Sequence, residues 1–541
     1  MQATAESMAT VVHPRVRPDV LEDREYQGRI AETAVDHNTL VVLPTGLGKT
    51  AIALRVIAEE LRRFPTRSVM VLAPTRPLVV QHAESIRRTL LAPDPVVLTG
   101  TVSPEKRSHP TEPPRVVVAT PQVIAHDLAH ETLSLGEFSL LVFDEAHRAV
   151  GDYPYAAIGL ANRTQGGARV LAMTASPGSR LERIREVWSN LGIERFEYRT
   201  LGDPDVQPYV FGVGVETISV AVPPAVRELA MRLRSTVQRQ VDSLHELRFL
   251  PEGATGSRRD LLALGERLRR EIDLARHRGE NAPAGLWSAV TAQTTAMKAL
   301  HALELAESQG ADQLRSFLEA QARPRSGRVT PAQRRFLADP DVVRTQEILS
   351  SLSVDLPKTE VAVRLIAEEL HRTPDAKVLV FTQYRDTSDS VVRALEALND
   401  PGVRAARFVG QASRGETQGL SQKEQVARLN EFRFGVLNCL VATSVAEEGL
   451  DIPSTDLVIF YEPVPDVIRT IQRRGRTGRS RAGRVVVLVS EGTRDVGLAR
   501  SARARERRMH EMLEKVEVEA RHGALPPPTP ATVQRSLLEF G

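Results

Sequence analysis

The chain has 541 residues, which is too long for one hydrophobic core and predicts several domains. Its composition is ordinary for a soluble protein, with 42% hydrophobic and 26% charged residues, and no apolar run reaches the length of a membrane span. The formal net charge of +3 permits nucleic-acid binding without requiring it. Aromatic residues make up only 4%, so we expect any nucleic acid to be held by its backbone rather than by stacked bases.

The N-terminus and the cysteine content both indicate an intracellular protein. The first twenty residues, MQATAESMATVVHPRVRPDV, lack the apolar core of a secretory signal, so we expect a cytoplasmic protein that does not contact a membrane. The single cysteine, Cys439, excludes an internal disulfide and a zinc site built from cysteines. It lies in the apolar run VLNCLVAT and is interpreted as a buried strand residue.

Between about residues 20 and 215, apolar runs of strand length alternate with helical patterns. The runs are TLVVLP, SVMVLAP, PVVLTG, RVVVAT, FSLLVFDE and ARVLAMTAS. Such alternation predicts a parallel sheet with helices on both of its faces. We assign residues 1–222 to this first α/β domain.

Within this domain, LVVLPTGLGKTAIALRVIAEEL is typical of a strand, a glycine-containing loop and a helix. The backbone amides of such a loop surround phosphates at the helix N-terminus, while Lys49 can reach the β- and γ-phosphates and Thr50 can bind Mg²⁺. The general pattern has glycine where this chain has Leu43, which disfavours a kinase or a transporter. The predicted nucleotide-binding residues of the loop are Thr45, Gly46, Leu47, Gly48, Lys49 and Thr50.

The run FSLLVFDEAH predicts a buried strand that ends in Asp144, at the sheet edge where open α/β folds bind ligands. Asp144 can hold Mg²⁺, directly or through water. Glu145 can orient and deprotonate the attacking water. Together with the phosphate loop, this acidic pair predicts a nucleotide hydrolase.

The pattern changes after the first domain and then repeats. Residues 223–350 carry apolar residues at three- and four-residue intervals and predict a helical insertion, which is either a packing spacer or a third nucleic-acid-contacting domain. Residues 351–500 return to the α/β rhythm, with the runs KVLVFTQ, RAARFVG, VLNCLVAT, DLVIFYE and GRVVVLVS. We therefore expect two parallel-sheet domains with an all-helical domain between them.

The octapeptide QRRGRTGR, residues 472–479, contains four arginines. The phosphate loop has no obvious arginine finger near it, and such a finger is worth several orders of magnitude in hydrolysis rate. If Arg476 and Arg479 serve this purpose, the two α/β domains must close on one nucleotide, and their reopening would convert hydrolysis into motion. Arg473 and Arg474 are candidates for nucleic-acid contact instead.

The C-terminal part divides into a basic helical extension, residues 501–523, and a proline-rich tail, residues 524–541. In QRSLLEFG, the residues Gln534, Leu537 and Phe540 have the spacing of peptides that bind a sliding clamp of the PCNA type. The second aromatic residue of such peptides is replaced by Gly541. The alternative is a C-terminus that is frayed or docked onto this chain itself.

A series of short motifs runs through residues 14–480 in a fixed order: REYQ, PTGLGKT, APTRPLVVQH, LTG, TPQ, DEAH, TAS, FTQYRDT, ATSVAEEGLDIP and QRRGRTGR. The series resembles the superfamily 2 helicases of the DEAH-box type, which implies two tandem RecA-like domains, ATP and Mg²⁺. Non-catalytic stretches such as HPRVRPDVLEDREYQ and KALHALELAESQG are similar to the archaeal Hef and eukaryotic FANCM family. That resemblance implies a 3′→5′ translocase that acts on forked or branched DNA in replication-fork repair and recombination.

The resemblance also implies roles for single residues. Arg24 and Gln27 match the residues on the adenine side of the nucleotide, and His147 and Gln472 match a pair that links the two domains. Gly449 and Asp451 fall on a nucleotide-binding motif of the second domain. The residues implied to contact the nucleic-acid strand are Thr75, Arg76, Thr120, Gln383, Thr443 and Ser444.

One departure from the family and two alternatives limit this assignment. Only about sixty residues follow the last motif, without an acidic nuclease cluster, so we expect a helicase-only form that does not cleave forks. The same motif set occurs in RNA-directed ATPases that act on double-stranded RNA, which is the first alternative. The second is a clamp-tethered binding protein with an inactive nucleotide site, and the intact Lys49, Asp144 and Glu145 argue against it.

Overall fold

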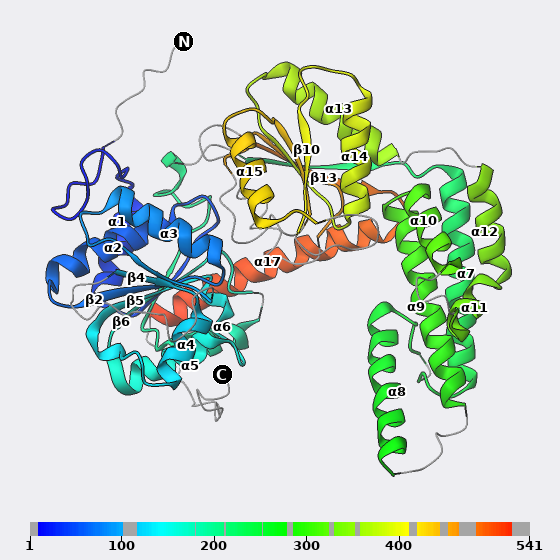
Figure 1. Cartoon of the computed structure of the whole chain (residues 1–541), viewed down its shortest axis with the longest axis horizontal. Coiled ribbons are helices and arrows are strands. Elements are labelled where there is room, and N and C mark those ends of the chain that lie inside the picture. Colours follow the sequence, from blue (N-terminus) through cyan, green and yellow to red (C-terminus); the bar gives the residue numbers. More distant parts are fainter. Residues whose placement is uncertain are drawn as a thin grey trace.

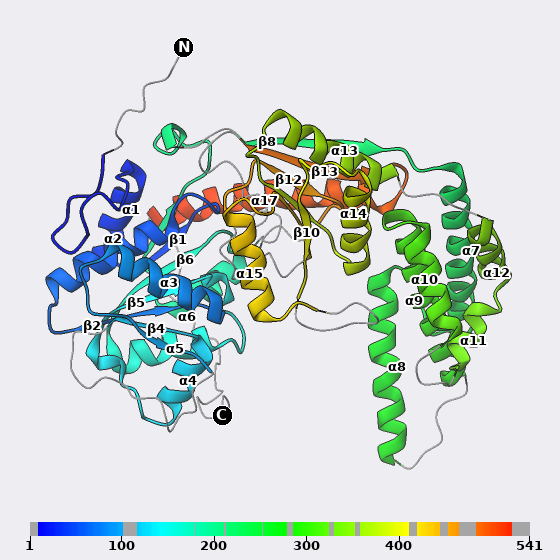
Figure 2. The same ribbon diagram turned by 45° about the horizontal axis from the view of Figure 1, so that its top comes forward.

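The computed structural model describes residues 9–100, 116–178, 180–209, 213–251, 253–278, 285–323, 329–351, 357–410, 419–443, 453–464 and 483–521. Two α/β domains lie side by side, and a helical bundle extends from the second (Figures 1 and 2). The arrangement confirms the predicted fold class, two parallel-sheet domains with an all-helical domain between them in the sequence.

The first sheet has, within the described residues, seven parallel strands in the order β3-β4-β2-β5-β6-β1-β7. They are β1 (Thr39–Val42), β2 (Ser68–Leu72), β3 (Val96–Leu98), β4 (Val116–Ala119), β5 (Phe138–Asp144), β6 (Arg169–Thr174) and β7 (Arg195–Tyr198). Leu40 and Val42 pack into the core on one face, while Val41 and Leu43 pack into the core on the other. Both faces are buried, which explains why the strands read as continuous apolar runs.

Helices cover both faces of this sheet. They are α1 (Glu25–Asp36), α2 (Lys49–Arg63), α3 (Arg76–Thr89), α4 (Pro121–Ala129), α5 (Pro154–Ala161) and α6 (Leu181–Leu191). Ile30, Ile52 and Val79 place α1, α2 and α3 on one face. Ile124 and Ile184 place α4 and α6 on the other, together with α5. The carboxyl ends of the strands thus meet the N-termini of the following helices at one edge.

The second sheet has, in the described part of the chain, six parallel strands in the order β10-β11-β9-β12-β13-β8. They are β8 (Val213–Val220), β9 (Val378–Phe381), β10 (Ala405–Phe408), β11 (Cys439–Ala442), β12 (Leu457–Phe460) and β13 (Gly483–Ser490). Cys439 is buried in β11, as its apolar run predicts. The helices on this sheet are α13 (Pro357–Arg372), α14 (Arg385–Ala397) and α15 (Gln422–Arg433).

Strand β8 corrects the predicted boundary at residue 222. All eight of its residues pair with β13, from Val213 opposite Gly483 to Val220 opposite Ser490. The chain therefore leaves the first domain after β7 and forms one strand of the second sheet before it enters the bundle, and the other five strands follow the bundle. The pattern of a strand does not specify its partner, so this crossing could not be predicted from the apolar run alone.

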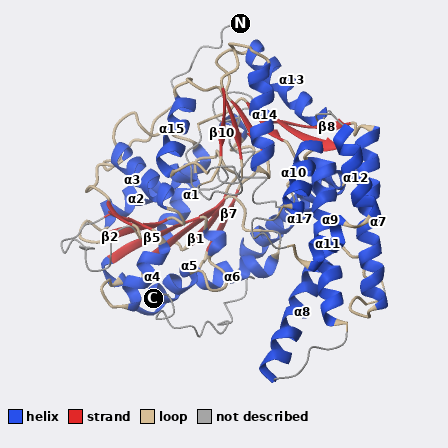
Figure 3. Cartoon of the chain, turned by 45° about the vertical axis from the view of Figure 1, so that its right-hand side comes forward, coloured by secondary structure: helices blue, strands red, loops and turns tan. Residues whose placement is uncertain are grey.

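The helical bundle comprises α7 (Pro224–Glu246), α8 (Arg258–Arg278), α9 (Leu286–Ser308), α10 (Ala311–Ala322), α11 (Pro331–Leu337) and α12 (Pro340–Ser351). A row of buried alanines on α9, including Ala292, Ala296 and Ala299, permits close packing of its neighbours. Helix α8 extends beyond the rest of the bundle (Figure 3). Among the helices that the structure describes, none has the length and apolar character needed to cross a membrane.

The last helix in the described ranges, α17 (Arg494–Arg521), joins the two α/β domains (Figures 1 and 2). Its first turn is held in the second domain, where Asp495 forms a buried ion pair with Lys358 at 2.5 Å. Met509, Leu513 and Val516 lie about 20 to 30 Å further along, at 1.5 Å per residue, and are buried in the core of the first domain. The predicted basic extension is therefore a helix shared by both domains.

Candidate ATPase site and nucleic-acid edge

The phosphate loop lies between β1 and α2, at the carboxyl edge of the first sheet. Gly46 and Gly48 have φ angles of 98° and 77°, in the left-handed region that favours glycine. A Cβ atom at Gly48 would also lie 2.4 Å from Gln27 Nε2. The loop therefore requires these glycines. The first amides of α2, which have no partner within a helix, lie at its end and suit phosphate oxygens.

Two side chains of α1 form hydrogen bonds with the backbone of the phosphate loop. Tyr26 Oη donates a hydrogen bond to Leu47 O at 2.7 Å, and Gln27 Nε2 donates to the same carbonyl at 3.1 Å. Both side chains are buried. Arg24 instead forms an ion pair with Glu22 at 2.7 Å. Gln27 therefore shapes the phosphate loop, and the adenine contact implied for Arg24 and Gln27 stays a prediction.

Lys49 and Thr50 begin α2, directly after the loop. Lys49 Nζ donates a hydrogen bond to Leu43 O at 3.1 Å, so the lysine rests on the backbone of the position where the general pattern has glycine. Thr45 Oγ1 is buried and has no hydrogen bond within the described residues. The loop thus carries the Lys49 ammonium group and the Thr45 hydroxyl at the carboxyl edge of the first sheet.

Asp144 ends β5 and is buried at the same sheet edge. Its Oδ2 lies 2.9 Å from His82 Nε2, and its Oδ1 accepts a hydrogen bond from the Glu145 amide at 3.0 Å. Burial opposes ionisation of Asp144. The hydrogen bond and charge of His82 and the charge of Lys49 outweigh burial and hold the pKa of the carboxyl below its usual range. The Asp144 carboxyl is therefore ionised at neutral pH.

His82 is a functional residue that the sequence reasoning missed. It was part of the stretch APTRPLVVQH, which was predicted to contact nucleic acid, and it had no role of its own. The buried face of α3 contains Val79, His82, Ala83 and Ile86. A buried histidine must have a polar partner. The position of His82 within an apolar stripe of helical spacing was therefore the sequence signal that could have identified it.

Glu145 adopts an unusual backbone conformation beside Asp144. Its φ is 51°, a left-handed value that costs a non-glycine residue about 1 kcal/mol or more. Glu145 Oε2 is buried, has no hydrogen bond in the described part of the chain, and lies 3.2 Å from His147 Nδ1. His147 Nδ1 lies 3.0 Å from Thr174 Oγ1. The arrangement places the Glu145 carboxyl beside His147 and next to Asp144, a position from which a carboxylate can act as a general base.

The residues at this edge also fit a magnesium ion. In the described ranges, no group of three or more His, Cys, Asp or Glu side chains could enclose a metal. Mg²⁺ at phosphate sites uses only one or two protein ligands and takes the rest from phosphate oxygens and water. The ionised Asp144 and the buried Glu145 Oε2 without a hydrogen bond provide the hard oxygen surroundings that such an ion prefers.

The TAS motif connects this edge to α17. Thr174 Oγ1 donates a hydrogen bond to Ser176 O at 3.1 Å, and Ser176 Oγ donates to Met509 Sδ of α17 at 3.0 Å. Beside it, Tyr198 Oη and His510 Nδ1 are 2.6 Å apart. A helix that begins in the second domain therefore contacts the motif that supports His147, a contact that the sequence did not predict.

Thr75 and Thr120 occupy equivalent positions on adjacent strands of the first sheet. Thr75 follows β2 and precedes α3, and Thr120 follows β4 and precedes α4. Neither side chain caps its helix, and Thr75 Oγ1 is buried without a hydrogen bond among the described residues. Arg76 is exposed beside them. Two helix N-termini and an arginine on one edge suit the phosphates of a nucleic-acid backbone.

The second sheet presents a similar edge. Gln383 follows β9 and Thr443 follows the adjacent strand β11. The Gln383 amide donates a hydrogen bond to Glu462 Oε2 at 3.2 Å, and the Gln383 residue is exposed. Thr443 is buried, and its amide donates to Phe408 O at 3.1 Å. The structure thus brings together two predicted strand-contacting residues in each domain.

The other predicted site residues lie outside the described residues. They are Ser444, Gly449, Asp451, Gln472, Arg473, Arg474, Arg476, Arg479, Gln534, Leu537 and Phe540. Their predicted roles in nucleotide binding, hydrolysis, strand contact and clamp binding stay predictions.

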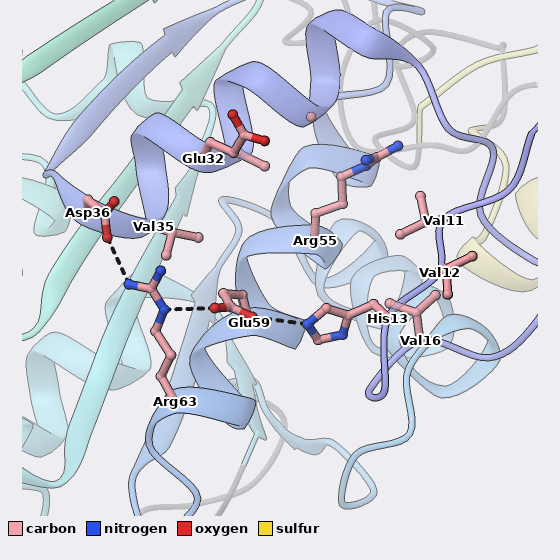
Figure 4. Close-up of a pocket in the computed structure, with 12 residues that line it drawn as sticks. Val11, Val12, His13, Val16, Glu32, Val35, Asp36, Arg55, Glu59 and Arg63 are labelled. Atoms are coloured by element: carbon pink, nitrogen blue, oxygen red, sulfur yellow. Dashed lines mark hydrogen bonds and ion pairs between the residues drawn. The ribbon is translucent and has the colours of Figure 1, made fainter.

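A pocket of about 270 Å³ lies between the N-terminal segment and helices α1 and α2 (Figure 4). Glu59 forms ion pairs with His13 at 3.1 Å and with Arg63 at 2.8 Å, and Arg63 pairs with Asp36 at 2.8 Å. The pKa of Glu59 is held well below its usual range, mainly by hydrogen bonds from Arg62. None of the predicted nucleotide-binding residues lines this pocket, so it is separate from the ATPase site.

Comparison with known proteins identifies three family regions. Residues 24–184 match the DEAD/DEAH box helicases, and residues 358–481 match the helicase conserved C-terminal domain. Residues 225–352 match the helical bundle of an ATP-dependent RNA helicase family. The third match covers the helical bundle, from α7 to α12.

Solved and curated relatives extend along nearly the whole chain. The crystal structure of the Pyrococcus furiosus Hef helicase domain is 40% identical, with a TM-score of 0.69, and the match covers 90% of this chain and 100% of that one. A Methanocaldococcus jannaschii protein, named as an RNA helicase, is 36% identical over 508 residues, which are 94% of this chain and 62% of the relative. The ATP-dependent DNA helicase MPH1 of Pyricularia oryzae is 32% identical over 515 residues, which are 92% of this chain and 46% of the relative.

The chain thus spans less than two thirds of these two curated relatives and the full length of the Hef helicase domain. The identity to that domain, the two sheet domains and the helical bundle agree with one another. The chain belongs to the superfamily 2 helicases of the DEAD/DEAH-box type, a class of ATP-driven enzymes, and within it to the group of Hef, FANCM and MPH1.

Proposed function

We propose that this chain is an ATP-dependent DNA helicase or translocase that moves 3′→5′ and acts on forked or branched DNA in replication-fork repair and recombination. The observation that carries the proposal is the ionised, buried Asp144 beside Lys49, on the sheet edge that also bears Thr75 and Thr120. One edge therefore combines a nucleotide site with positions suited to a nucleic-acid backbone. The name of the MPH1 relative supports DNA as the polymer.

In the proposed reaction, Lys49 leaves the Leu43 carbonyl and binds the β- and γ-phosphates of ATP. Thr50 and Asp144 would hold Mg²⁺, and the ion would neutralise charge on the phosphates. Glu145 accepts a proton from the attacking water through its carboxylate. His147 lies within reach of both Glu145 and Thr174, so it links the base to the TAS motif.

The second domain completes the proposed site. Arg476 and Arg479 would approach the γ-phosphate when the domains close, and Gln472 would meet His147. Helix α17 already joins the domains, because its Met509 contacts Ser176 while its Asp495 is held by Lys358. Closure and reopening around this helix would move the two strand-contacting edges relative to each other. Such motion is the proposed basis of translocation.

The proposed substrate places the protein inside the cell, on DNA. Contacts through helix N-termini and threonines read the backbone rather than the bases, which fits the 4% aromatic content. Binding of the tail residues Gln534, Leu537 and Phe540 to a sliding clamp remains part of the proposal.

The alternative is action on double-stranded RNA, which the name of the Methanocaldococcus relative favours. The test compares ATP hydrolysis by the purified chain with single-stranded DNA, forked DNA, Holliday junctions and duplex RNA at equal nucleotide concentrations. We expect forked DNA to stimulate hydrolysis most. Stimulation by duplex RNA alone would contradict the DNA assignment.

A further inference from the structure

The joint between α9 and α10 reaches into the carboxyl edge of the second sheet. Gln309 forms this joint and is almost completely buried. Its Nε2 donates a hydrogen bond to Glu462 Oε1 at 2.6 Å, and its Oε1 accepts a hydrogen bond from Thr387 Oγ1 of α14. Both ends of this bundle side chain are therefore bound to the second domain.

Glu462 is the group that Gln309 touches, and it also holds the loop after β9. The side chain is buried. Oε1 accepts from Thr382 Oγ1 at 3.1 Å as well as from Gln309, and Oε2 accepts from the Gln383 amide at 3.2 Å. One buried carboxyl thus connects the bundle to the backbone of the residue predicted to contact the nucleic-acid strand.

Further contacts fix the same loop and joint. The rings of His301 on α9 and Tyr384 have centroids 6.4 Å apart, and Gln313 Nε2 of α10 donates to Ser390 Oγ of α14 at 2.9 Å. Helix α10 lies beside α14 in both views (Figures 1 and 2). On the other side, Ser308 Oγ donates to Asp495 Oδ1 at 3.3 Å. A buried and satisfied polar network of this kind is stiff, because each broken hydrogen bond leaves a desolvated group behind.

We infer that Gln309 is a positioning residue for the nucleic-acid contact at Gln383. The bundle side chain fixes Glu462, Glu462 fixes the Gln383 amide, and the exposed Gln383 side chain is thereby aimed at the strand. The bundle and the second domain then move as one rigid unit. A DNA branch bound to the bundle would therefore change the affinity of the Gln383 contact for the strand. The identity of the strand as nucleic acid rests on the proposed function. The claim that Gln309 positions the Gln383 backbone through Glu462 does not depend on it.

The first test measures ATP hydrolysis as a function of forked-DNA concentration for Gln309→Ala. We expect the half-saturating DNA concentration to rise about five- to tenfold, as for the loss of one hydrogen bond of ordinary strength, with KM for ATP unchanged. A merely structural defect would lower kcat at unchanged half-saturation. Gln313→Ala is the matched control, since it removes a joint contact that does not reach Glu462, and it should leave half-saturation within twofold of the wild-type value.

Two further variants sharpen the test. In the Gln383→Ala background, Gln309→Ala should add no further loss, because Gln309 acts through Gln383. The exchange variant Gln309→Glu with Glu462→Gln retains a hydrogen bond between the two side chains and should recover half-saturation to within about threefold of the wild type. Additive losses in the first pair, or no recovery in the second, overturn the inference.

A readout without nucleic acid separates this inference from the proposed function. Hydrogen exchange of the amides at residues 382–387 should be faster in Gln309→Ala than in the wild type, and unchanged in Gln313→Ala. Unchanged exchange in Gln309→Ala overturns the inference whatever the substrate is. Faster exchange in a protein that DNA does not stimulate supports the structural step and overturns the proposed function alone.

Discussion

The two sheets have the same strand order but use their carboxyl edges differently. The order β3-β4-β2-β5-β6-β1 of the first corresponds to β10-β11-β9-β12-β13-β8 of the second. In the first domain β1 leads into the phosphate loop, and in the second β8 leads into the helical bundle. The bundle is thus inserted at the position that the phosphate loop occupies in the first domain.

The fourth strand in each of these orders, β5 or β12, carries an acidic residue at its carboxyl end, and the two acids show the same contrast. Asp144 at β5 lies beside Lys49 and His82, and its pKa is held below the usual range despite burial. Glu462 after β12 is buried chiefly among neutral donors, and burial raises its pKa above the usual range. One sheet edge therefore keeps a charge for chemistry, while the other uses its acid as a structural joint. The environment, not the fold, decides which role the carboxyl takes.

The largest expected effect comes from exchanging these two acids for amides. Asp144→Asn should lower ATP hydrolysis about 100-fold or more, because a neutral amide is a poor magnesium ligand, and it should leave the urea midpoint nearly unchanged. Glu462→Gln should instead lower the free energy of unfolding by about 1–3 kcal/mol, because its amide group cannot accept all of the buried donors. Steady-state hydrolysis and urea unfolding measure the two effects. A loss of hydrolysis in Glu462→Gln as complete as that in Asp144→Asn would remove the contrast.

A smaller effect is expected from pH, with opposite signs in the two regions. Burial raises the pKa of Glu60 in α2 from its usual 4.5 to about 7, so its contribution to stability is present below pH 4.5 and lost as pH rises to 7. Glu304 in the bundle is also buried, but His301, Arg258 and Arg494 lower its pKa to about 2. Its contribution is present above pH 4.5 and lost as pH falls towards 2. Each contribution is at most about 3 kcal/mol.

The two tryptophans allow these signs to be measured separately, because Trp188 lies in the first domain and Trp287 in the bundle. In Trp287→Phe, urea unfolding followed through Trp188 should show a lower midpoint at pH 7.5 than at pH 5. Adding Glu60→Gln should remove most of that difference. A midpoint that rises from pH 5 to 7.5 equally with and without Glu60→Gln contradicts the assignment to Glu60.

Local patterns predicted the parts of the site that are contiguous in sequence. The phosphate loop needs glycines at fixed spacing, and Asp144 follows a fully apolar strand, so both signals lie within one stretch of chain. The alternation of apolar runs and helical patterns likewise gave both sheets and the bundle. These features depend on backbone conformation and burial, which a short segment specifies.

Contacts between distant segments were not predictable in the same way. Met509, Leu513 and Val516 of α17 have the spacing of a buried helical face, but that spacing does not identify the first domain as the partner. Gln309 and Glu462 are 153 residues apart, and a buried glutamine cannot be told from an exposed one by its neighbours. Strand β8 was assigned to the wrong domain for the same reason.

The most direct test of the central claim, that the edge of the first sheet is the ATPase site, is hydrolysis by Lys49→Ala. Hydrolysis would be measured at saturating forked DNA, and binding of the same DNA by fluorescence anisotropy. We predict loss of hydrolysis by about 100-fold or more, because no other group replaces the lysine at the phosphates, with most of the DNA binding retained. Hydrolysis that persists near the wild-type rate would contradict the account.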